Sequence, residues 1–436
     1  MSEEKKIEAM PHPAPAPGTT APQTAEITAS APETQEAVQE PAPAVEDTAQ
    51  PEPVDAAYDV EMPDIPMPEI QERVEIADGK KTAFRFAFIG AGQGGSRLAQ
   101  TFYQLGYRRV CAINTAKQDL TTLKLPEPNK MAIGDGGAGK DPTAAAKIFH
   151  DRREDVLDFM RRCFGPVYDR TVICAGAGGG TGAGSVVGLV HVARELQIAN
   201  KCASDKVGVV LALPKVTEGK RVNANAYWVL RELRELVDKG YVSPLIVVDN
   251  ERISALYPGL AIDPFWQRAN MSICSLFDLF NTVCMQASSY TAFDPNDFKT
   301  ILDSGMIVFG ATPVAKWMEA AAISFALREN LKQNILSGGV DLRSGSLGAA
   351  VVIASRTILG SVPHEHLDQA FDQLTRLLKP GSMVHRGIYS GSKEAMVVYT
   401  AIGGLNSPEE KLEELRRLGD VLVNEKPGIG PVLGEH

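Results

Sequence analysis

The sequence predicts an α/β protein in which a doubly wound parallel sheet is followed by a long central helix and then by a smaller α+β domain with a mixed sheet. Three observations lead to this fold class. Short apolar runs alternate with helical patterns from residue 84 onward, which is typical of parallel strands that are buried on both faces. Glycine-rich turns separate several of these runs from the helices that follow. Past residue 295 the regular alternation of strands and helices ends.

The first domain is expected to alternate strands and helices in regular order. Apolar runs predict strands at 84–89, 110–113, 171–175, 207–213 and 245–248. Apolar residues at helical spacing predict helices after the first strand, after the third strand and over 221–239. Ligands of such sheets bind at the carboxyl ends of the strands, so we expect the functional site at that edge.

The central helix and the second domain follow from a change in the pattern. Asp263-Pro264 is typical of an N-cap followed by proline, and predicts a helix of roughly 25 residues that ends near Ser289. Beyond it we expect strands at 306–309, 348–354, 382–390 and 395–402, and helices near 313–335 and 365–379. Residues 407–410 match a capping box that would begin a final helix, and the last dozen residues are expected to be loose.

The chain is expected to divide into five segments: a tail over 1–80, a ligand-binding domain over 81–262, the central helix over 263–290, a C-terminal α+β domain over 291–405, and a terminal helix with a loose tail over 406–436. The first 80 residues hold 13 prolines, 18 acidic and 4 basic residues, which gives a net charge of −14 against −10 for the whole chain. Such a segment buries too little apolar surface to offset its ordering entropy, so we expect it to be disordered. Residues 62–70 are more apolar and are either linker, which we favour, or a docking peptide for an adaptor.

Composition disfavours several classes of protein. No run of 18 or more apolar residues occurs, so no membrane span is expected, and the N-terminus lacks the layout of a signal peptide. The six cysteines show neither CxxC nor metal-ligand spacing, and are expected to be reduced core residues of a cytoplasmic protein. The seven histidines are scattered, so no metal site is expected from protein ligands alone. The sequence gives no direct signal for nucleic-acid binding.

The first glycine loop, residues 90–95, follows an expected strand and precedes an expected helix. Its sequence, Gly90-Ala-Gly-Gln-Gly-Gly95, matches GxGxxG. Glycines let backbone N–H groups approach a phosphate, and a helix N-terminus favours negative charge. A dinucleotide site would also need an acidic residue after the second strand, where this sequence has Ile113-Asn-Thr-Ala116. A NAD-dependent oxidoreductase therefore remains only as a weaker alternative.

Two further glycine loops occur. The second, residues 134–141, is similar to a P-loop, but its last position is Asp141 in place of the Ser or Thr that binds magnesium. No strand is apparent immediately before it, so we do not assign a P-loop. The third loop, residues 176–184, holds six glycines in nine residues between a strand and a helix, which is far more than a turn needs. Together the three loops predict a phosphate chain that is held from several sides, mainly by backbone.

These loops resemble the signature segments of the tubulin/FtsZ family. Residues 178–184 are similar to the GGGTG(S/T)G motif, and residues 90–95 to the first phosphate loop. Residues 114–120 resemble the NTDAQAL-type loop, and residues 137–142 resemble the GAGGNP loop that faces the γ-phosphate. Residues 214–219 resemble the PFxFEG segment, and Asp249-Asn250 resembles the acid–amide pair before the central helix. The resemblance covers residues 84–405.

The resemblance implies a site for GTP or GDP, together with Mg²⁺. Glu218 would contact the ribose and Asn270, on the central helix, would read the guanine. Phe265 lies five residues before Asn270, one residue further than the family's stacking ring. By similarity, the nucleotide contacts are assigned to Gly92, Gln93, Gly94, Gly95, Asn114, Ala138, Gly139, Gly178, Gly179, Gly180, Thr181, Gly182, Glu218, Asn250 and Asn270.

The resemblance also implies that the catalytic residues reach the nucleotide from a second subunit. Asp294 and Asp297, called the acid pair below, lie in the loop that in this family enters the next subunit's site and orients the attacking water. From the residues alone, Asp294-Pro295 equally fits a helix N-cap, and both roles are compatible. A site divided between two ends of one protein implies head-to-tail self-assembly into open filaments. The implied function is a GTP-hydrolysing cytoskeletal protein for cell division or a related positioning task.

Three positions depart from the family pattern. Ala116 replaces an acidic residue, Arg221 lies one place early, and Ala292 stands where asparagine begins the catalytic loop. These departures leave open a second function, a nucleotide-binding filament scaffold with little turnover.

Overall fold

The computed structural model describes residues 80–259, 261–319, 321–332 and 340–422. The expected disorder of the first 79 residues, the docking segment 62–70 and the loose C-terminal residues all lie outside the described residues. Within the described ranges, no helix is both long and apolar enough to span a bilayer. All six cysteines are free, and four of them are buried.

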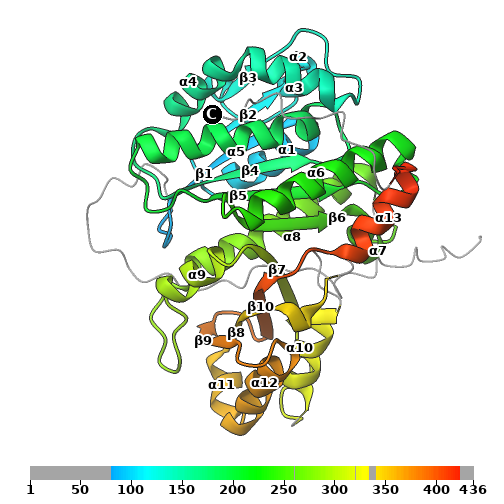
Figure 1. Cartoon of the computed structure of the whole chain (residues 1–436). Helices are drawn as coiled ribbons and strands as arrows, with labels where there is room; N and C mark the ends of the chain where they lie inside the picture. Colours follow the sequence, from blue (N-terminus) through cyan, green and yellow to red (C-terminus); the bar gives the residue numbers. More distant parts are fainter. Residues whose placement is uncertain (1–79, 260, 320, 333–339, 423–436) are drawn as a thin grey trace, which may run out of the picture. The chain divides into compact units, whose positions relative to one another are not determined.

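A parallel sheet forms the first half of the fold (Figure 1). Its strands are β1 (Phe86–Ala91), β2 (Val110–Asn114), β3 (Lys130–Ala132), β4 (Arg170–Gly176), β5 (Val207–Leu213) and β6 (Val242–Asp249). They lie in the order β3-β2-β1-β4-β5-β6, and all their pairings are parallel. The order reverses between β1 and β4, which is where doubly wound sheets leave a crevice at the carboxyl ends of their strands.

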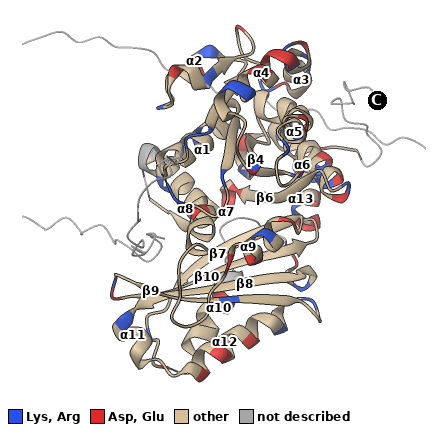
Figure 2. Ribbon diagram, turned by 90° about the vertical axis from the view of Figure 1, so that its left-hand side faces the viewer, with Lys and Arg blue, Asp and Glu red and all other residues tan. Residues whose placement is uncertain are grey.

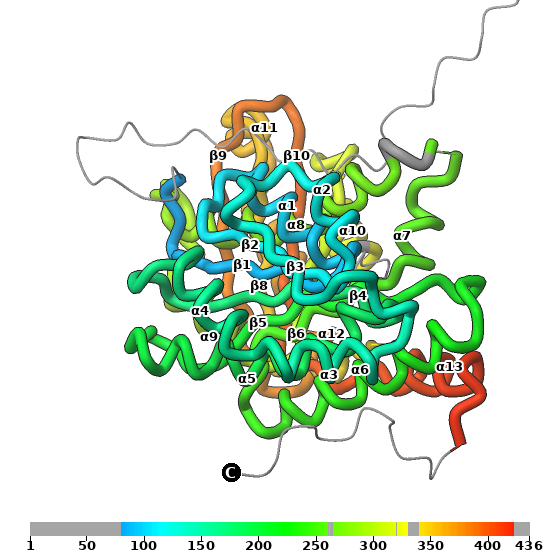
Figure 3. The backbone as a smooth tube through the Cα atoms, turned by 90° about the horizontal axis from the view of Figure 1, so that it is seen from above, coloured from blue at the N-terminus to red at the C-terminus, as the bar shows by residue number. Residues whose placement is uncertain are grey.

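Helices cover both faces of this sheet. They are α1 (Gly92–Gln104), α2 (Lys117–Thr121), α3 (Pro142–Asp151), α4 (Arg153–Phe164), α5 (Thr181–Ala199), α6 (Lys220–Asp238) and α7 (Asn250–Leu256), with 3₁₀ turns at Glu127–Asn129 and Val216–Glu218. Because side chains alternate along a strand, β1 contributes to two cores. Phe86 and Phe88 pack in the core that contains α1 and α8, whereas Ala87 and Ile89 pack in the core of α4, α5 and α6. Figure 3 shows α1 and α8 on one side of the strands and α5 and α6 on the other.

The second half of the fold continues the same sheet. Its elements are α8 (Ile262–Val283), α9 (Pro295–Leu302), β7 (Met306–Pro313), α10 (Ala322–Lys332), a 3₁₀ turn (Leu342–Ser344), β8 (Leu347–Ser355), α11 (Arg356–Ser361), α12 (His364–Leu377), β9 (Met383–Gly391), β10 (Met396–Leu405) and α13 (Glu409–Gly419). β7 joins β6 through one parallel pair, Leu245 with Met306. β10 is antiparallel to β7 and β8, while β8 and β9 are parallel. The mixed sheet is therefore confirmed, as part of one ten-stranded sheet, and α9 lies between its two halves (Figure 2).

Two predicted helix starts are wrong. α8 begins at Ile262 with Ala261 as its N-cap, so Asp263 is not the cap, and it ends at Val283, before Ser289. Proline is tolerated at residue 264 because the first four N–H groups of a helix have no intrahelical acceptor. The capping box at 407–410 is also absent, since the Oγ of Ser407 is buried without a partner in the described structure and α13 has no side-chain cap.

The sequence reading also missed structure around the second glycine loop. β3 ends two residues before Gly134, although no strand was expected there. α3 and α4 follow the loop, and Asp141 caps α3 by accepting hydrogen bonds from the N–H groups of Thr143 (2.9 Å) and Ala144 (3.2 Å). The last position of a P-loop also lies at the start of a helix. Asp141 occupies such a position, but its carboxylate caps the backbone N–H groups of α3.

Candidate nucleotide site

A cavity of about 650 Å³ lies at the carboxyl ends of the parallel strands. Its walls come from all three glycine loops, from the 3₁₀ turn after β5 and from α8. Fourteen of the fifteen residues assigned to nucleotide contacts line it: Gly92, Gln93, Gly94, Asn114, Ala138, Gly139, Gly178, Gly179, Gly180, Thr181, Gly182, Glu218, Asn250 and Asn270. Segments separated by up to 178 residues in sequence therefore meet around one space.

The first glycine loop meets the third at close range. Gly92 has a φ of +70°, which disfavours a side chain, and a Cβ there would lie 2.9 Å from the backbone N of Gly182. Gly95 is the one assigned residue that does not line the cavity. A Cβ on Gly95 would lie 2.1 Å from the carbonyl oxygen of Cys174, so this glycine lets α1 pack on β4.

The third glycine loop is shaped by two neighbouring segments, α6 and the second glycine loop. A Cβ on Gly178 would lie 2.4 Å from Cγ1 of Val222, and one on Gly180 would lie 2.8 Å from Cβ of Ala138. By contrast, Gly179 has nothing within 4 Å of a Cβ position and borders open space. The loop ends at the N-terminus of α5, a 19-residue helix whose first N–H groups adjoin the cavity. Free N–H groups and the positive end of the helix dipole favour an anion here.

Asn114 and Asn225 connect the loops by hydrogen bonds. Oδ1 of Asn114 accepts a hydrogen bond from Thr181 Oγ1 (3.0 Å), and its Nδ2 donates to Asp119 Oδ2 (2.9 Å). Nδ2 of Asn225, on α6, donates to the carbonyl oxygens of Lys140 (3.1 Å) and Gly178 (3.2 Å). The sequence reading missed Asn225; its only signal was a polar residue on the inner face of a helix. These bonds hold the second and third loops in one arrangement before any ligand binds.

Among the residues that the structure describes, five charged ones line the cavity. Arg97, Lys140 and Lys215 are cationic, whereas Asp119 and Glu218 carry carboxylates. Lys140 has a φ of 60° in the second loop. One oxygen of Glu218 accepts a hydrogen bond from the backbone N of Lys215 (2.8 Å), which fixes this carboxylate at the start of the 3₁₀ turn. The charged residues that line the cavity are therefore net positive, which complements a phosphate chain.

The end of the cavity formed by α8 carries an aromatic ring. Asn270 and Trp266 both line it, and residues four apart lie on one face of a helix. Phe265, the ring considered from the sequence, is 8% exposed and packs in the core with Lys215 Nζ at 5.3 Å from its centroid. Neighbouring residues on a helix point about 100° apart, so only one of these two rings can face the cavity.

The acid pair does not line the cavity. Asp294 is the N-cap of α9, and its Oδ1 accepts a hydrogen bond from the backbone N of Asp297 (2.9 Å). Oδ2 of Asp297 accepts in return from the backbone N of Asp294 (3.1 Å), which completes a capping box. The helix-cap role is thus present in the structure.

The acid pair belongs to the opposite edge of the sheet. The carbonyl oxygen of Leu302, at the end of α9, accepts hydrogen bonds from Ser243 Oγ (2.7 Å) and Arg170 Nη1 (3.0 Å), which lie at the starts of β6 and β4. The ring of Phe298 lies 6.0 Å from that of Phe84, just before β1. From Arg170 to the cavity residue Gly176, strand β4 advances by six residues, or roughly 20 Å. One chain therefore presents its cavity and its acid pair at different edges.

Comparisons with known proteins agree with these features. A family model described as the GTPase domain of the Tubulin/FtsZ family matches residues 85–258. Cell division protein FtsZ of Porphyromonas gingivalis is 28% identical over 228 residues, which are 50% of this chain and 46% of that protein, so the chain spans about half the length of this relative. Cell division protein FtsZ 1 of Pyrococcus furiosus is 26% identical over 314 residues, covering 70% of this chain and 76% of that protein.

Solved structures with a similar fold include filament-forming proteins. A GTPγS-form protofilament of TubZ from Bacillus thuringiensis serovar israelensis has a TM-score of 0.68 at 18% identity, covering 79% of this chain and 93% of that one. The GTPγS-bound protofilament of CetZ2 from Haloferax volcanii has a TM-score of 0.62 at 20% identity, covering 77% and 98%. At these identities the likeness shows the fold.

Proposed function

Because the chain is a divergent member of the tubulin/FtsZ family and carries that family's GTPase domain, we propose that it is a cytoskeletal protein that binds GTP, assembles head to tail and hydrolyses GTP at the junction between subunits. The observation that supports this proposal best is the separation of the cavity from the acid pair. The two lie at opposite edges of the parallel strands, so the acid pair of one subunit meets the cavity of the next when copies stack end to end.

The cavity has the features that a nucleoside triphosphate requires. The glycine loops and the N-terminus of α5 would hold the phosphates, and Arg97, Lys140 and Lys215 would balance their charge. Glu218 would contact the ribose, Asn270 would read the guanine edge and Trp266 would stack on the base. The oxidoreductase alternative has less support, because the carboxyl end of β2 presents Asn114, and its side chain is already bonded to Thr181 and Asp119.

Magnesium would be held mainly by the nucleotide. The described residues contain no group of three or more His, Cys, Asp or Glu side chains placed to hold a metal ion. Mg²⁺ commonly binds phosphate oxygens and one or two carboxylates while keeping several waters. Asp119 fits the carboxylate role, since it lines the cavity beside the third loop and has one oxygen bonded to Asn114. When bound, the ion would neutralise charge on the phosphates.

The acid pair would orient the attacking water from the neighbouring subunit. Asp294 is exposed at the start of α9, so its carboxylate can enter another molecule's cavity. Phosphoryl transfer depends chiefly on positioning and on charge stabilisation, and a carboxylate can hold water in line with the γ-phosphate. The three cationic residues that line the cavity would offset repulsion between the carboxylates and the phosphates.

Filament formation follows from the same geometry. A contact between two different surfaces of one protein is heterologous, and it yields an open polymer where its rotation does not close a ring. The TubZ and CetZ2 structures are described as protofilaments, which supports the same assembly for this chain. We further propose that the filament serves cell division or a related positioning task, since the curated relatives are named as cell division proteins.

The test combines pelleting and phosphate release, with GTP against ATP, over a range of protein concentrations. We expect GTP turnover per subunit to rise steeply with concentration, in step with the pelleted fraction, and ATP to support neither. Asp294→Asn and Asp297→Asn should lower turnover at least about 100-fold while GTP binding persists, because asparagine keeps the capping bonds but removes the charge. Asn296→Ala, at an exposed position between the two acids, is the matched control and should leave turnover unchanged.

Two outcomes would overturn the proposal in different ways. Turnover per subunit that is equal at all concentrations would exclude a site shared between molecules. Pelleting with GTP but without phosphate release would favour the alternative, a nucleotide-binding scaffold with little turnover, which the substitution of an acidic residue by Ala116 keeps open.

A further inference from the structure

Strand β9 holds the loop that precedes α9. The backbone N of Ile388 donates to the carbonyl oxygen of Thr291 (2.8 Å). The hydroxyl of Tyr389 accepts a hydrogen bond from the backbone N of Phe293 (2.8 Å) and donates to its carbonyl oxygen (3.0 Å). A Cβ on Gly387 would lie 3.0 Å from Cβ of Phe293, so a glycine permits this close approach. The position of the acid pair is thus set by a strand of the C-terminal half.

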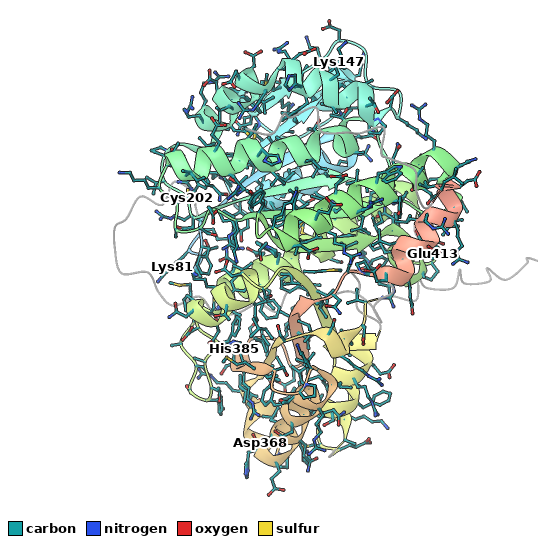
Figure 4. All side chains as sticks on the ribbon, in the orientation of Figure 1. Lys81, Lys147, Cys202, Asp368, His385 and Glu413 are labelled. Carbon is teal, nitrogen blue, oxygen red and sulfur yellow. The ribbon has the colours of Figure 1, made fainter. Side chains whose placement is uncertain are left out.

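His385, labelled in Figure 4, lies on the same strand and contacts the acid pair through Asp297. Residues 385, 387 and 389 share one face of β9, because side chains alternate along a strand. Nδ1 of His385 lies 2.8 Å from Oδ1 of Asp297, and the His385 side chain is 12% exposed. Its ring packs edge-on against Phe293, with 6.3 Å between the ring centroids. The imidazole is therefore held on one side by Phe293 and directed at the Asp297 carboxylate.

The carboxylate oxygens of the acid pair are unequally engaged. Asp297 uses both oxygens, Oδ1 with His385 and Oδ2 with the backbone N of Asp294. Asp294 uses Oδ1 for the backbone N of Asp297, while its Oδ2 has no partner among the described residues. An ionised carboxylate only accepts hydrogen bonds, so a hydrogen bond across this 2.8 Å contact requires a proton on Nδ1 of His385. His385 therefore removes the last rotational freedom of the Asp297 carboxylate.

Within the described residues, the other ring nitrogen of His385 adds no hydrogen bond of its own. Nε2 of His385 is buried and has no hydrogen-bond partner in the part of the chain that the structure describes. Buried polar atoms are nearly always paired, and an unpaired one lowers stability. Within this part of the chain, His385 thus leaves Nε2 without a hydrogen bond while Nδ1 contacts Asp297. Local losses of stability of this kind are expected at functional sites.

We propose that His385 is a positioning residue for GTP hydrolysis. Its Nδ1–H fixes the Asp297 carboxylate, so that the acid pair enters the neighbouring subunit's cavity in a single geometry. The inference rests on the proposed function, because it assigns a role within that divided site. It also places part of the catalytic control in β9, a strand that contributes nothing to the lining of its own chain's cavity.

Three substitutions separate positioning from packing. The amide nitrogen of asparagine occupies about the place of Nδ1, whereas that of glutamine occupies about the place of Nε2. His385→Asn should therefore keep turnover within about threefold of wild type, while His385→Gln and His385→Leu should lower kcat about 10- to 100-fold, the range expected for one hydrogen bond to a charged group. KM for GTP, and the concentration at which subunits pellet with a non-hydrolysable GTP analogue, should not change.

The outcomes are distinguishable from those that test the proposed function. Equal turnover in wild type and all three variants would refute the role of His385 while the shared GTPase site stands. Equal losses in all three variants, accompanied by weaker pelleting, would show a packing role instead. Wild-type filaments that release no phosphate would refute the proposed hydrolysis and the positioning role with it. Should His385→Leu fail to fold, judged by circular dichroism, the comparison of Asn with Gln still decides the question.

Discussion

Gly94 and Gly95 are neighbours in the first turn of α1 but have different surroundings. A Cβ on Gly95 would lie 2.1 Å from the carbonyl oxygen of Cys174 on β4, whereas a Cβ on Gly94 would have nothing within 4 Å. Gly94 lines the cavity and Gly95 does not. The two positions thus separate the packing role of the first loop from its proposed binding role.

We expect opposite consequences from adding one methyl group at each position. Gly95→Ala should lower the free energy of unfolding by about 1–3 kcal/mol, because α1 must move away from β4. Gly94→Ala should leave that free energy unchanged or raise it by up to about 1 kcal/mol, since alanine favours helix, but it should weaken GTP binding by placing a methyl group in the cavity. Urea unfolding without nucleotide and GTP titration measure the two effects. Equal destabilisation by both changes would contradict the assignment.

At this scale the sequence identified the loops but not which side chains face the cavity. The motifs placed fourteen of the fifteen assigned residues around one cavity, because glycine spacing reports where backbone must come close. They did not distinguish Gly95 from Gly94, since a glycine packed against a strand and a glycine that borders a cavity look alike in sequence. The sequence also left open which ring faces the cavity, because the direction of a side chain depends on helix phase; Trp266 lines the cavity, whereas Phe265 packs in the core.

Helix α9 is anchored to the amino-end edge of the sheet by Arg170 and Asp303. The side chain of Arg170 is 5% exposed and its guanidinium pairs with Asp303, which also pairs with Lys299 (2.9 Å). Burial alone would raise the pKa of Asp303, but the charges of Arg170 and Lys299 outweigh it and hold the pKa below the ordinary aspartate value. A pKa that is lower in the folded than in the unfolded state stabilises the fold above the unfolded value, and this contribution is lost as pH falls through the folded value.

Asp303→Asn should therefore lower the free energy of unfolding by about 1–3 kcal/mol at pH 7, because Arg170 stays buried without a charged partner. The difference from wild type should shrink as pH falls below about 4, because the aspartate of the unfolded wild-type chain then takes up a proton before that of the folded chain does. Urea titrations at pH 7 and near pH 3 measure both values. Asp372→Asn, which removes an exposed partner of Arg386, is the control and should change stability by less than about 0.5 kcal/mol. A difference that persists unchanged at low pH would contradict the electrostatic account.

Elements were predicted best where buried strands gave continuous apolar runs. The expected strand 207–213 coincides with β5, and the expected helix 221–239 is shifted by only one residue from α6. α3 and β3 were missed because short or alanine-rich segments carry little periodic signal. The starts of α8 and α13 were misplaced because the prediction relied on residue types that commonly cap helices. In the structure the N-cap residues are Ala261 and Pro408, and neither side chain accepts a capping hydrogen bond.

For the molecule as a whole, the sequence predicted two halves but not their continuity. β6 and β7 pair only between Leu245 and Met306, residues separated by α7, α8 and α9. Local patterns cannot report such a pairing, because it depends on how distant segments meet. Placement of the cavity at the carboxyl ends of the strands was predictable from the alternating pattern. The location of the acid pair at the other edge was implied only by family resemblance, since Asp294 fits a helix cap equally well.

The separation of cavity and acid pair leads to a mixing experiment. Wild-type protein is held below the concentration at which it pellets, and the double variant Asp294→Asn/Asp297→Asn is added in excess with GTP. The variant keeps an intact cavity but offers no acid pair, so it should build filaments that include scattered wild-type subunits. Each wild-type acid pair would then face a variant's cavity, and phosphate release per wild-type subunit should rise by at least about tenfold, the gain expected from ordering a reacting pair.

A site contained within one subunit predicts a different result from the same mixture. Turnover per wild-type subunit would then stay at its dilute value, whatever the amount of variant added, because no partner would be needed. Adding His385→Gln protein in place of the double variant should give an intermediate rate of phosphate release. Its acid pair is present, but its Asp297 lacks the donor at Nδ1. We expect phosphate release per filament subunit to be lowest for the double variant, intermediate for His385→Gln and highest for wild type. This order would connect the divided site with the residue that positions it.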